Sequence, residues 1–118
     1  MRVDEEYLES VLDVVETVPR GSATTYGDVA EVVGRRLGRG GPRQVGAALR
    51  DSGGAVPWWR VVNAQGRPPA HHVTRALDLL RDEGCPLVPD GSRVDLRAAR
   101  VDWDEQMDLS AGPGSESV

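Results

Sequence analysis

Three short helical patterns fill the first half of the sequence, and they constrain the fold more than any other feature. Residues 4–18 place apolar side chains at helical spacing behind an acidic first turn, and Pro19 marks the end of that helix. A second amphipathic pattern covers residues 25–34, and a third covers residues 42–52. None of the three is long, so each needs the others to bury its apolar face.

The second and third helical patterns have clear start signals. Thr25 suits an N-cap with Asp28 three residues on, which is the capping-box pattern, and Gly34 is expected to end the helix. Pro42 suits the first turn of the third helix, which carries Arg43 on its outer face. Two short helices joined by a tight Gly/Arg loop suggest a helix-turn-helix.

The remaining sequence predicts a small β element and one more helix. Residues 60–66 read as a short strand and a turn, residues 73–84 as an amphipathic helix capped by its final glycine, and residues 86–96 as a hairpin with a central Asp-Gly turn. The fold class is therefore mainly α with a small β element, a winged-helix-like helix-turn-helix DNA-binding domain. We assign this domain to residues 1–108 and a flexible tail to residues 109–118.

Charge is distributed unevenly along the chain. The net charge is −5, but residues 20–75 hold nine arginines against three acidic residues, whereas the segments before and after them are strongly acidic. A basic central segment that also holds two adjacent tryptophans is what a polyanion-binding face would look like. A solvated charge run is an equally good explanation at this point.

Composition excludes several classes of protein. No apolar run approaches the roughly 20 residues that a membrane span requires, and the acidic N-terminus is unlike a signal peptide, so we expect a cytoplasmic, nucleoid-associated protein without membrane contact. Cys85 is the only cysteine and is expected to act as a small buried hydrophobe. The pair His71 and His72 is expected in an exposed loop, and no metal or cofactor is predicted.

Two further features point to a binding surface. The chain has three tryptophans and no phenylalanine, yet Trp58 and Trp59 stand side by side in the stretch VPWWRVV. Gly46 lies inside the third helix, where a glycine costs about 1 kcal/mol relative to alanine, so either something approaches the backbone there or two helices pack tightly. A core role for Trp58 is the alternative to a binding role.

Four separate motifs, in order and at matching spacing, carry a family resemblance. The runs VPRGSATTYGDVAEVVG, PRQVGAALR, VPWWRVVNAQG and LLRDEG resemble the DNA-binding domain of the O6-alkylguanine-DNA alkyltransferases, from the first helix to about Trp103. The third motif of these enzymes reads Pro-Cys-His-Arg, and its cysteine accepts the alkyl group. Trp58 occupies the acceptor position here, which is the mark of the alkyltransferase-like proteins that bind the lesion without repairing it.

The resemblance implies a protein that is not an enzyme. Trp58 offers no nucleophile. Trp59 stands where these enzymes have the histidine that serves as the base, and it cannot act as one because an indole N–H does not take up a proton at neutral pH. Glu83 aligns with the carboxylate that orients this histidine, and its role is expected to be structural. Trp59 either reshapes the pocket or packs behind Trp58.

The resemblance also implies a set of site residues. Arg43 is the finger that enters the duplex, and Tyr26 pushes against the phosphate beside a flipped nucleotide. The pocket floor and the turn after it form the lesion site, in which an indole contacts the alkylated base. The residues expected to contact DNA are Thr25, Tyr26, Arg43 and Gly46, and those expected to form the lesion pocket are Val56, Pro57, Trp58, Trp59, Asn63 and Gly66.

The partners implied are double-stranded DNA containing O6-alkylguanine and the proteins of nucleotide excision repair, bound by a monomer. Three other functions stay open. A winged-helix transcriptional regulator would share the helix-turn-helix but gives no reason for the tryptophan pair. An active alkyltransferase would need a thiol, and the single cysteine lies outside the motif. A protein-interaction domain would not bind DNA at all.

Overall fold

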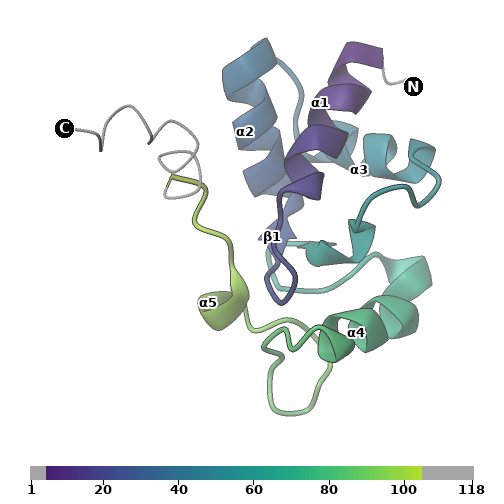
Figure 1. The fold of residues 1–118 in the computed structure, drawn as a ribbon, viewed down its shortest axis with the longest axis vertical. Coiled ribbons are helices and arrows are strands. Elements are labelled where there is room, and N and C mark those ends of the chain that lie inside the picture. Colours follow the sequence, from purple (N-terminus) through teal and green to yellow (C-terminus); the bar gives the residue numbers. More distant parts are fainter. Residues whose placement is uncertain (1–4, 105–118) are drawn as a thin grey trace.

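Three helices pack against one another at one end of the molecule and two lie at the other end (Figure 1). The structure is a computed structural model that describes residues 5–104. It confirms a mainly helical helix-turn-helix fold with a small β element. The helices are α1 (Glu5–Glu16), α2 (Tyr26–Leu37), α3 (Pro42–Asp51), α4 (Val73–Asp82) and α5 (Leu96–Ala99).

A short parallel sheet joins the two ends. Strand β1 (Thr24–Thr25) pairs with β2 (Val61–Val62), and the turn η1 (Trp58–Arg60) leads directly into β2. Successive strand residues point to opposite faces, so Val61 belongs to the core of the three-helix bundle while Val62 belongs to a second core near α4. The sheet therefore fixes the position of η1 between the two cores.

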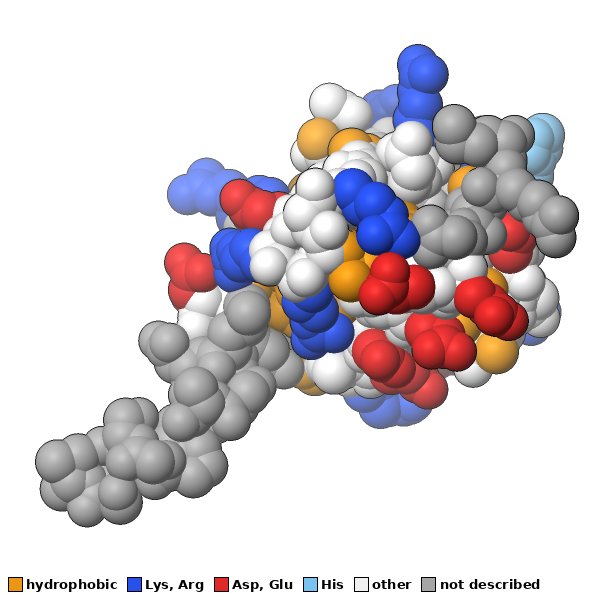
Figure 2. Space-filling view, turned by 90° about the horizontal axis from the view of Figure 1, so that it is seen from above, with side chains coloured by type: hydrophobic (Ala, Val, Ile, Leu, Met, Phe, Trp, Pro, Cys, Tyr) orange, Lys and Arg blue, Asp and Glu red, His pale blue; other side chains and the backbone are white. Residues whose placement is uncertain are grey.

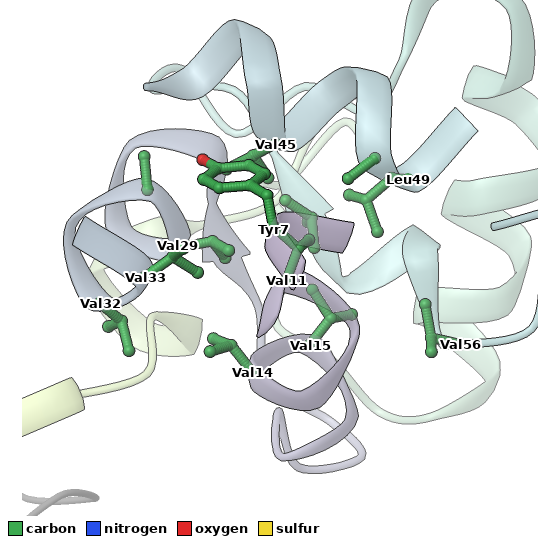
Figure 3. Close-up of a cluster of buried hydrophobic side chains, with 13 residues drawn as sticks. Tyr7, Val11, Val14, Val15, Val29, Val32, Val33, Val45, Leu49 and Val56 are labelled. Carbon is green, nitrogen blue, oxygen red and sulfur yellow. The ribbon is translucent and has the colours of Figure 1, made fainter. Parts of the chain in front are cut away.

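The larger core lies among α1, α2 and α3. Figure 3 shows the ring of Tyr7 enclosed by apolar side chains from all three helices, and Tyr7 itself is only 3% exposed. Valines supply most of the packing volume, in keeping with a chain that has no phenylalanine. The fully buried members include Val11, Val29, Val33 and Val45.

The loop between α2 and α3 lies against this core. Gly40 has a left-handed backbone with φ of 93°, and a Cβ atom at this position would collide with the Tyr7 ring. Arg39 forms an ion pair with Glu6 at 3.3 Å, which ties the same loop to α1. The Gly/Arg loop thus fixes the start of α3 relative to α1.

The predicted starts of α2, α3 and α4 are confirmed, but two of the predicted helix ends are not. The hydroxyl of Thr25 accepts a hydrogen bond from the backbone N–H of Asp28 at 3.0 Å, as an N-cap should. Helix α2 continues past Gly34 to Leu37 and ends at Gly38, whose φ of 72° provides the left-handed cap. Helix α1 ends at Glu16, two residues early, because the residue before Pro19 disfavours the helical conformation.

The predicted hairpin at residues 86–96 contains only one bridge, between Leu87 and Val94. Pro86 and Pro89 flank the first predicted strand and have no N–H to donate to a ladder, which accounts for the difference. The end of the segment forms α5, which the sequence analysis did not predict.

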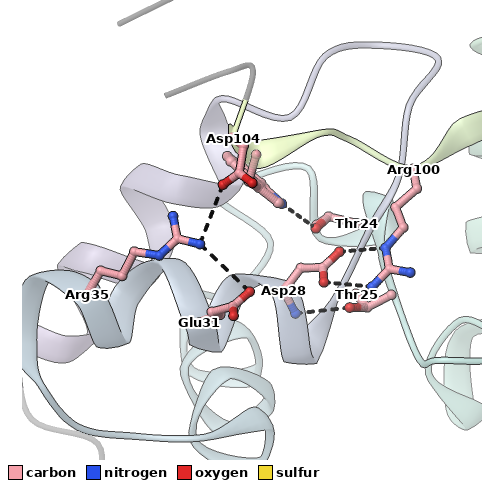
Figure 4. A network of polar contacts seen from close by, with 8 residues as sticks. Thr24, Thr25, Asp28, Glu31, Arg35, Arg100 and Asp104 are labelled. Carbon is pink, nitrogen blue, oxygen red and sulfur yellow. Dashed lines mark hydrogen bonds and ion pairs between the residues drawn. The ribbon is translucent and has the colours of Figure 1, made fainter. Parts of the chain in front are cut away.

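A C-terminal segment binds back onto the start of α2 (Figure 4). Arg100 makes a bidentate pair with Asp28 at 2.8 and 2.9 Å, and the indole N–H of Trp103 donates to the hydroxyl of Thr24 at 2.8 Å. The hydrogen bonds from Arg100 lower the pKa of Asp28 below its ordinary value, and they outweigh the opposing effect of burial. These contacts fix the first turn of α2, which is the first helix of the helix-turn-helix.

The proposed boundary at residue 108 and the tail at residues 109–118 lie outside the described residues. Across residues 5–104, no helix has the length and apolar content needed to cross a bilayer.

Candidate nucleic-acid interface

Helix α3 presents its polar face to solvent. Arg43 follows the first residue of α3, is exposed, and forms no ion pair with any of the described residues. Gln44 accepts a hydrogen bond from the backbone N–H of Gly41 at 2.9 Å, so the first turn of α3 is capped and held in place. Val45, Ala48 and Leu49 anchor the opposite face in the core, as predicted. The fold therefore aims an unpaired arginine away from the protein.

Surface charge is separated in space as well as along the chain. Figure 2 shows acidic side chains gathered on one part of the face seen from above, while arginines lie mainly around them. The outer side of α1 is exposed and acidic over Glu5, Glu6 and Glu9. The net charge of −5 is thus a poor guide to the potential around α3.

A cavity of about 610 Å³ opens beside α3. Its walls come from the start of α2, the second half of α3, the turn after α3, the tryptophan of η1, the turn η2 (Ala70–His72) and the start of α4. A volume of this size lies in the range of small-molecule sites. The lining residues are Tyr26, Gly46, Leu49, Arg50, Gly53, Gly54, Trp58, Pro69, Ala70, His71, His72 and Arg75.

Trp58 is a wall of this cavity and not a member of either core. Its ring meets that of Trp59 edge to face, with centroids 5.8 Å apart and an interplanar angle of 87°. The centre of the His72 ring lies 5.5 Å from that of Trp58. The indole of Trp58 is therefore half-buried, contacts two other rings and lines the cavity.

Trp59 packs behind Trp58 and does not line the cavity. Its indole N–H donates to a carboxylate oxygen of Glu83 at 3.0 Å, which joins η1 to the end of α4. The Arg60 guanidinium also lies 5.5 Å from the centre of the Trp59 ring. Of the two alternatives for Trp59, the structure favours packing behind Trp58.

Glu83 and Arg60 form a buried ion pair beneath the tryptophans. Arg60 donates to both carboxylate oxygens at 3.0 and 2.7 Å and to the carbonyl of Val18 at 2.8 Å. The side chain of Glu83 is 5% exposed and that of Arg60 is 14% exposed. Burial alone would raise the pKa of Glu83, but the hydrogen bonds from Arg60 and Trp59 outweigh it and hold the pKa below its ordinary value.

The predicted site residues do not all meet. Tyr26, Gly46 and Trp58 come together at the cavity, and Thr25 supports the first of them as the N-cap of α2. Val56 belongs to the core, and the buried Gly66 lies so close to the Val94 carbonyl that a Cβ would collide with it. Outside the cavity wall lie Val56, Pro57, Trp59, Asn63 and Gly66.

The surroundings of Gly46 bear on the two explanations for this glycine. A Cβ atom there would meet only the end of the Arg50 side chain, at an ordinary contact distance of 3.6 Å. No other helix packs against this position, so tight helix–helix packing does not explain the glycine. The other explanation, the close approach of a ligand, stays a prediction.

Sequence reasoning found three of the twelve residues of the cavity wall and missed nine, four of which are basic. The histidine pair is exposed, as predicted, but it also lines the cavity together with Arg50 and Arg75. His72 is fourteen positions from Trp58, and no local pattern links the two. The only available signal was the basic character of the central segment.

The fold and the free arginine of α3 define a helix-turn-helix DNA-binding domain. Residues 6–85 match the sequence profile described as 6-O-methylguanine DNA methyltransferase, DNA binding domain. The chain belongs to this family, among its alkyltransferase-like members.

Individual relatives agree with this assignment. The DNA base-flipping protein of Escherichia coli K12 is 38% identical over 107 residues, which cover 87% of this chain and 80% of that protein. The DNA base-flipping protein of Vibrio parahaemolyticus is 35% identical over 65 residues, and the match covers 53% of this chain and 62% of that protein.

A solved structure matches as well. Alkyltransferase-like protein 1 of Schizosaccharomyces pombe, Atl1, is 37% identical over 90 residues, which cover 71% of this chain and 80% of that protein. The crystal structure of Atl1 in complex with damaged DNA containing O6-carboxymethylguanine superposes with a TM-score of 0.69 at 29% identity. It covers 86% of this chain and 99% of the Atl1 chain.

Proposed function

We propose that this protein recognises O6-alkylguanine in duplex DNA, flips the damaged nucleotide into the cavity beside Trp58, and marks the site for nucleotide excision repair without removing the alkyl group. The observation that carries the proposal is the cavity, which opens beside α3, the helix that carries the exposed Arg43, and has the Trp58 indole in its wall. The relatives named for base flipping and for binding damaged DNA support it.

The arrangement suits flipping on physical grounds. An alkylated base edge inside a duplex is inaccessible, so a reader must unstack the nucleotide at a cost of a few kcal/mol. Arg43 is free to fill the gap in the stack, and Trp58 offers an apolar surface on which the base can rest, worth about 1–3 kcal/mol. Arg43 would thus stabilise the duplex that the nucleotide leaves, and Trp58 would stabilise the flipped base.

The side chains at the cavity do not suit repair. Dealkylation needs a thiolate next to the alkyl carbon, and none of the cavity-lining residues is a cysteine. Cys85 is buried in the second core, where burial and the Glu83 carboxylate raise its pKa to about 11. A lesion bound in this way must be passed to another activity, which we propose to be nucleotide excision repair acting on the complex with the monomer.

The proposal is tested by competition between two duplexes that differ at one base, guanine or O6-methylguanine, each prepared in two unrelated sequence contexts. A lesion reader prefers the methylated duplex in both contexts. Preference for one context regardless of the methyl group would identify a sequence-specific regulator. Absence of DNA binding would instead identify a protein-interaction domain.

DNA binding should weaken as salt rises. Arg36, Arg43, Arg50, Arg67 and Arg75 form no ion pair with the described residues, and arginines that reach phosphates release counterions. If two to four of them do so, a plot of log affinity against log salt has a slope of roughly −2 to −4. A flat plot would contradict a basic DNA face. Arg81→Gln serves as the control and should leave this slope unchanged, because Arg81 is paired with Asp78.

Gly46→Ala should separate stability from binding. The alanine fits the free protein and favours the helix, so we expect the free energy of unfolding to rise by up to about 1 kcal/mol while affinity for DNA falls. Gly34→Ala is the matched control, because it also lies in a helix interior with nothing within 4 Å of the added atom. Equal affinities of the two variants would show that DNA does not approach Gly46.

Restoring a thiol at the cavity should not restore repair. In Trp58→Cys the new thiol lacks a base at position 59, because Trp59 donates its N–H to Glu83. The ring of His72 lies 5.5 Å from the Trp58 ring, but among the described residues it is not hydrogen-bonded to Glu83, so it does not rebuild the family's relay. The variant also leaves a void where the indole was, which loosens the in-line geometry. We expect negligible transfer of labelled methyl from DNA to protein.

The double variant Trp58→Cys with Trp59→His rebuilds a path to Glu83 and should transfer more methyl than the single variant. Efficient transfer by Trp58→Cys alone would contradict the role given to position 59. Stoichiometric transfer by the wild-type protein would contradict the non-enzymatic proposal altogether.

A further inference from the structure

Two aromatic residues of the cavity wall are placed by the two strands of the small sheet. Tyr26 is the first residue of α2 and directly follows β1, whereas Trp58 begins η1, which leads into β2. The two strands pair over two residues each, and so short a pairing is a weak tie on its own. The position of Tyr26 relative to Trp58 therefore needs support from another part of the chain.

The C-terminal segment, residues 99–103, holds the chain on both sides of Tyr26. Before Tyr26, the hydroxyl of Thr24 accepts a hydrogen bond from the indole N–H of Trp103 at 2.8 Å. After it, the carboxylate of Asp28 accepts two hydrogen bonds from the Arg100 guanidinium, at 2.8 and 2.9 Å (Figure 4). The first turn of α2 is thus held at both ends.

The backbone of the C-terminal segment is bound as well. The N–H of Ala23 donates to the carbonyl of Ala99 at 2.9 Å, and the N–H of Val101 donates to the carbonyl of Ala23 at 2.9 Å. The side chain of Asp28 is only 17% exposed, and the Arg100 guanidinium binds both of its oxygens. A bidentate pair that is partly buried fixes orientation better than an exposed ion pair does.

We infer that Arg100 and Asp28 are positioning residues, which hold the first turn of α2 so that Tyr26 stays in the cavity wall and the protein can prefer damaged over undamaged DNA. The inference rests on the proposed function and adds two residues that lie outside the cavity wall. The walls of a binding site discriminate between ligands only when the contacts behind them lock their positions. Phosphate contacts, which damaged and undamaged duplexes share, carry no such discrimination.

The test compares Arg100→Ala with Asp28→Ala. The first variant removes a positive charge and the second removes a negative one, so a direct attraction of Arg100 to phosphates predicts opposite effects on DNA affinity. A positioning pair predicts the same effect, because either variant breaks both hydrogen bonds. Arg97→Ala is the control, because Arg97 is exposed on α5 and forms no ion pair with the residues that the structure describes.

Two quantities are measured on the full-length protein. The first is the ratio of the affinities for an O6-methylguanine duplex and for the matching guanine duplex, which we expect each of the two variants to lower by about three- to fivefold. The second is amide hydrogen exchange of the free protein. Exchange at position 28, whose N–H binds the Thr25 hydroxyl, should speed up more than exchange at Val45 in α3. Arg97→Ala should change neither quantity.

The outcomes separate this inference from the proposed function. If the wild type prefers the damaged duplex and both variants keep its affinity ratio, the positioning role is wrong while lesion recognition stands. If Arg100→Ala weakens binding to both duplexes alike and Asp28→Ala strengthens it, Arg100 acts on phosphates directly and the inference is wrong. If the wild type itself shows no preference for the damaged duplex, the proposed function fails and the inference fails with it.

Discussion

Glu83→Ala is expected to lower the free energy of unfolding by about 3–5 kcal/mol at neutral pH, because it leaves the Arg60 guanidinium buried without its counter-charge. The same substitution removes the acceptor of the Trp59 indole N–H. Chemical denaturation at pH 7 measures the loss. A loss below about 1 kcal/mol would show that the pair does not hold η1 against α4.

The double variant Glu83→Leu with Arg60→Met provides a control for this prediction. Replacing both charges by apolar side chains of similar volume is often close to neutral, so the double variant should be more stable than Glu83→Ala. If the two are equally unstable, the effect comes from lost volume and not from an uncompensated charge.

The stabilisation by Glu83 also depends on pH, and its sign follows from the direction of the shift. The pKa of Glu83 in the folded state is held below its ordinary value of 4.5. The contribution is therefore fully present above pH 4.5 and is lost as the pH falls through the folded-state pKa. Between pH 5 and pH 3 we expect the wild type to lose stability more steeply than Glu83→Gln, which has no carboxylate to protonate. Parallel curves would contradict this assignment.

Arg43→Ala is expected to weaken binding to an O6-methylguanine duplex by a few kcal/mol and to reduce nucleotide flipping. Arg43 is exposed and makes no ion pair within residues 5–104, so its loss should leave the fold intact. Flipping can be followed with a fluorescent cytosine analogue opposite the lesion, whose emission rises when its partner leaves the stack.

Arg97→Ala removes one exposed arginine far from α3 in sequence and serves as the charge-matched control. A general effect of charge would lower affinity in both variants alike and leave flipping unchanged in both. Unchanged flipping in Arg43→Ala would show that another residue fills the gap in the duplex.

The parts of the fold that depend on neighbouring residues could be predicted from the sequence. The cap at Thr25 is a contact within four residues, and the buried face of α3 follows from the helical spacing of its apolar residues; both are confirmed. The end of α2 could not be fixed, because Gly34 and Gly38 are both suitable caps and only the tertiary packing selects the second. The hairpin was predicted with more strand pairing than it has, because the prediction rested on the apolar pattern and the Asp-Gly turn. It did not take into account that the prolines have no N–H to donate to a neighbouring strand.

The site was less predictable, because its contacts join distant segments. Trp59 and Glu83 are 24 positions apart, and their hydrogen bond decided between two alternatives that the sequence left open. Trp58 was assigned to a pocket through a family resemblance, whereas the partners that complete the wall, His72 and Arg75, belong to a turn and a helix that no motif marks. Roles in DNA binding remain predictions for all of these residues.

The central claim is that a damaged nucleotide leaves the duplex and enters the cavity beside Trp58. The most direct measurement is a crystal structure of the protein bound to a duplex containing one O6-methylguanine. We predict that the guanine ring will lie in the cavity in contact with the Trp58 indole, that Arg43 will occupy the gap in the base stack, and that the methyl group will still be attached to the base. A lesion that remains stacked and paired within the bound duplex would contradict the account.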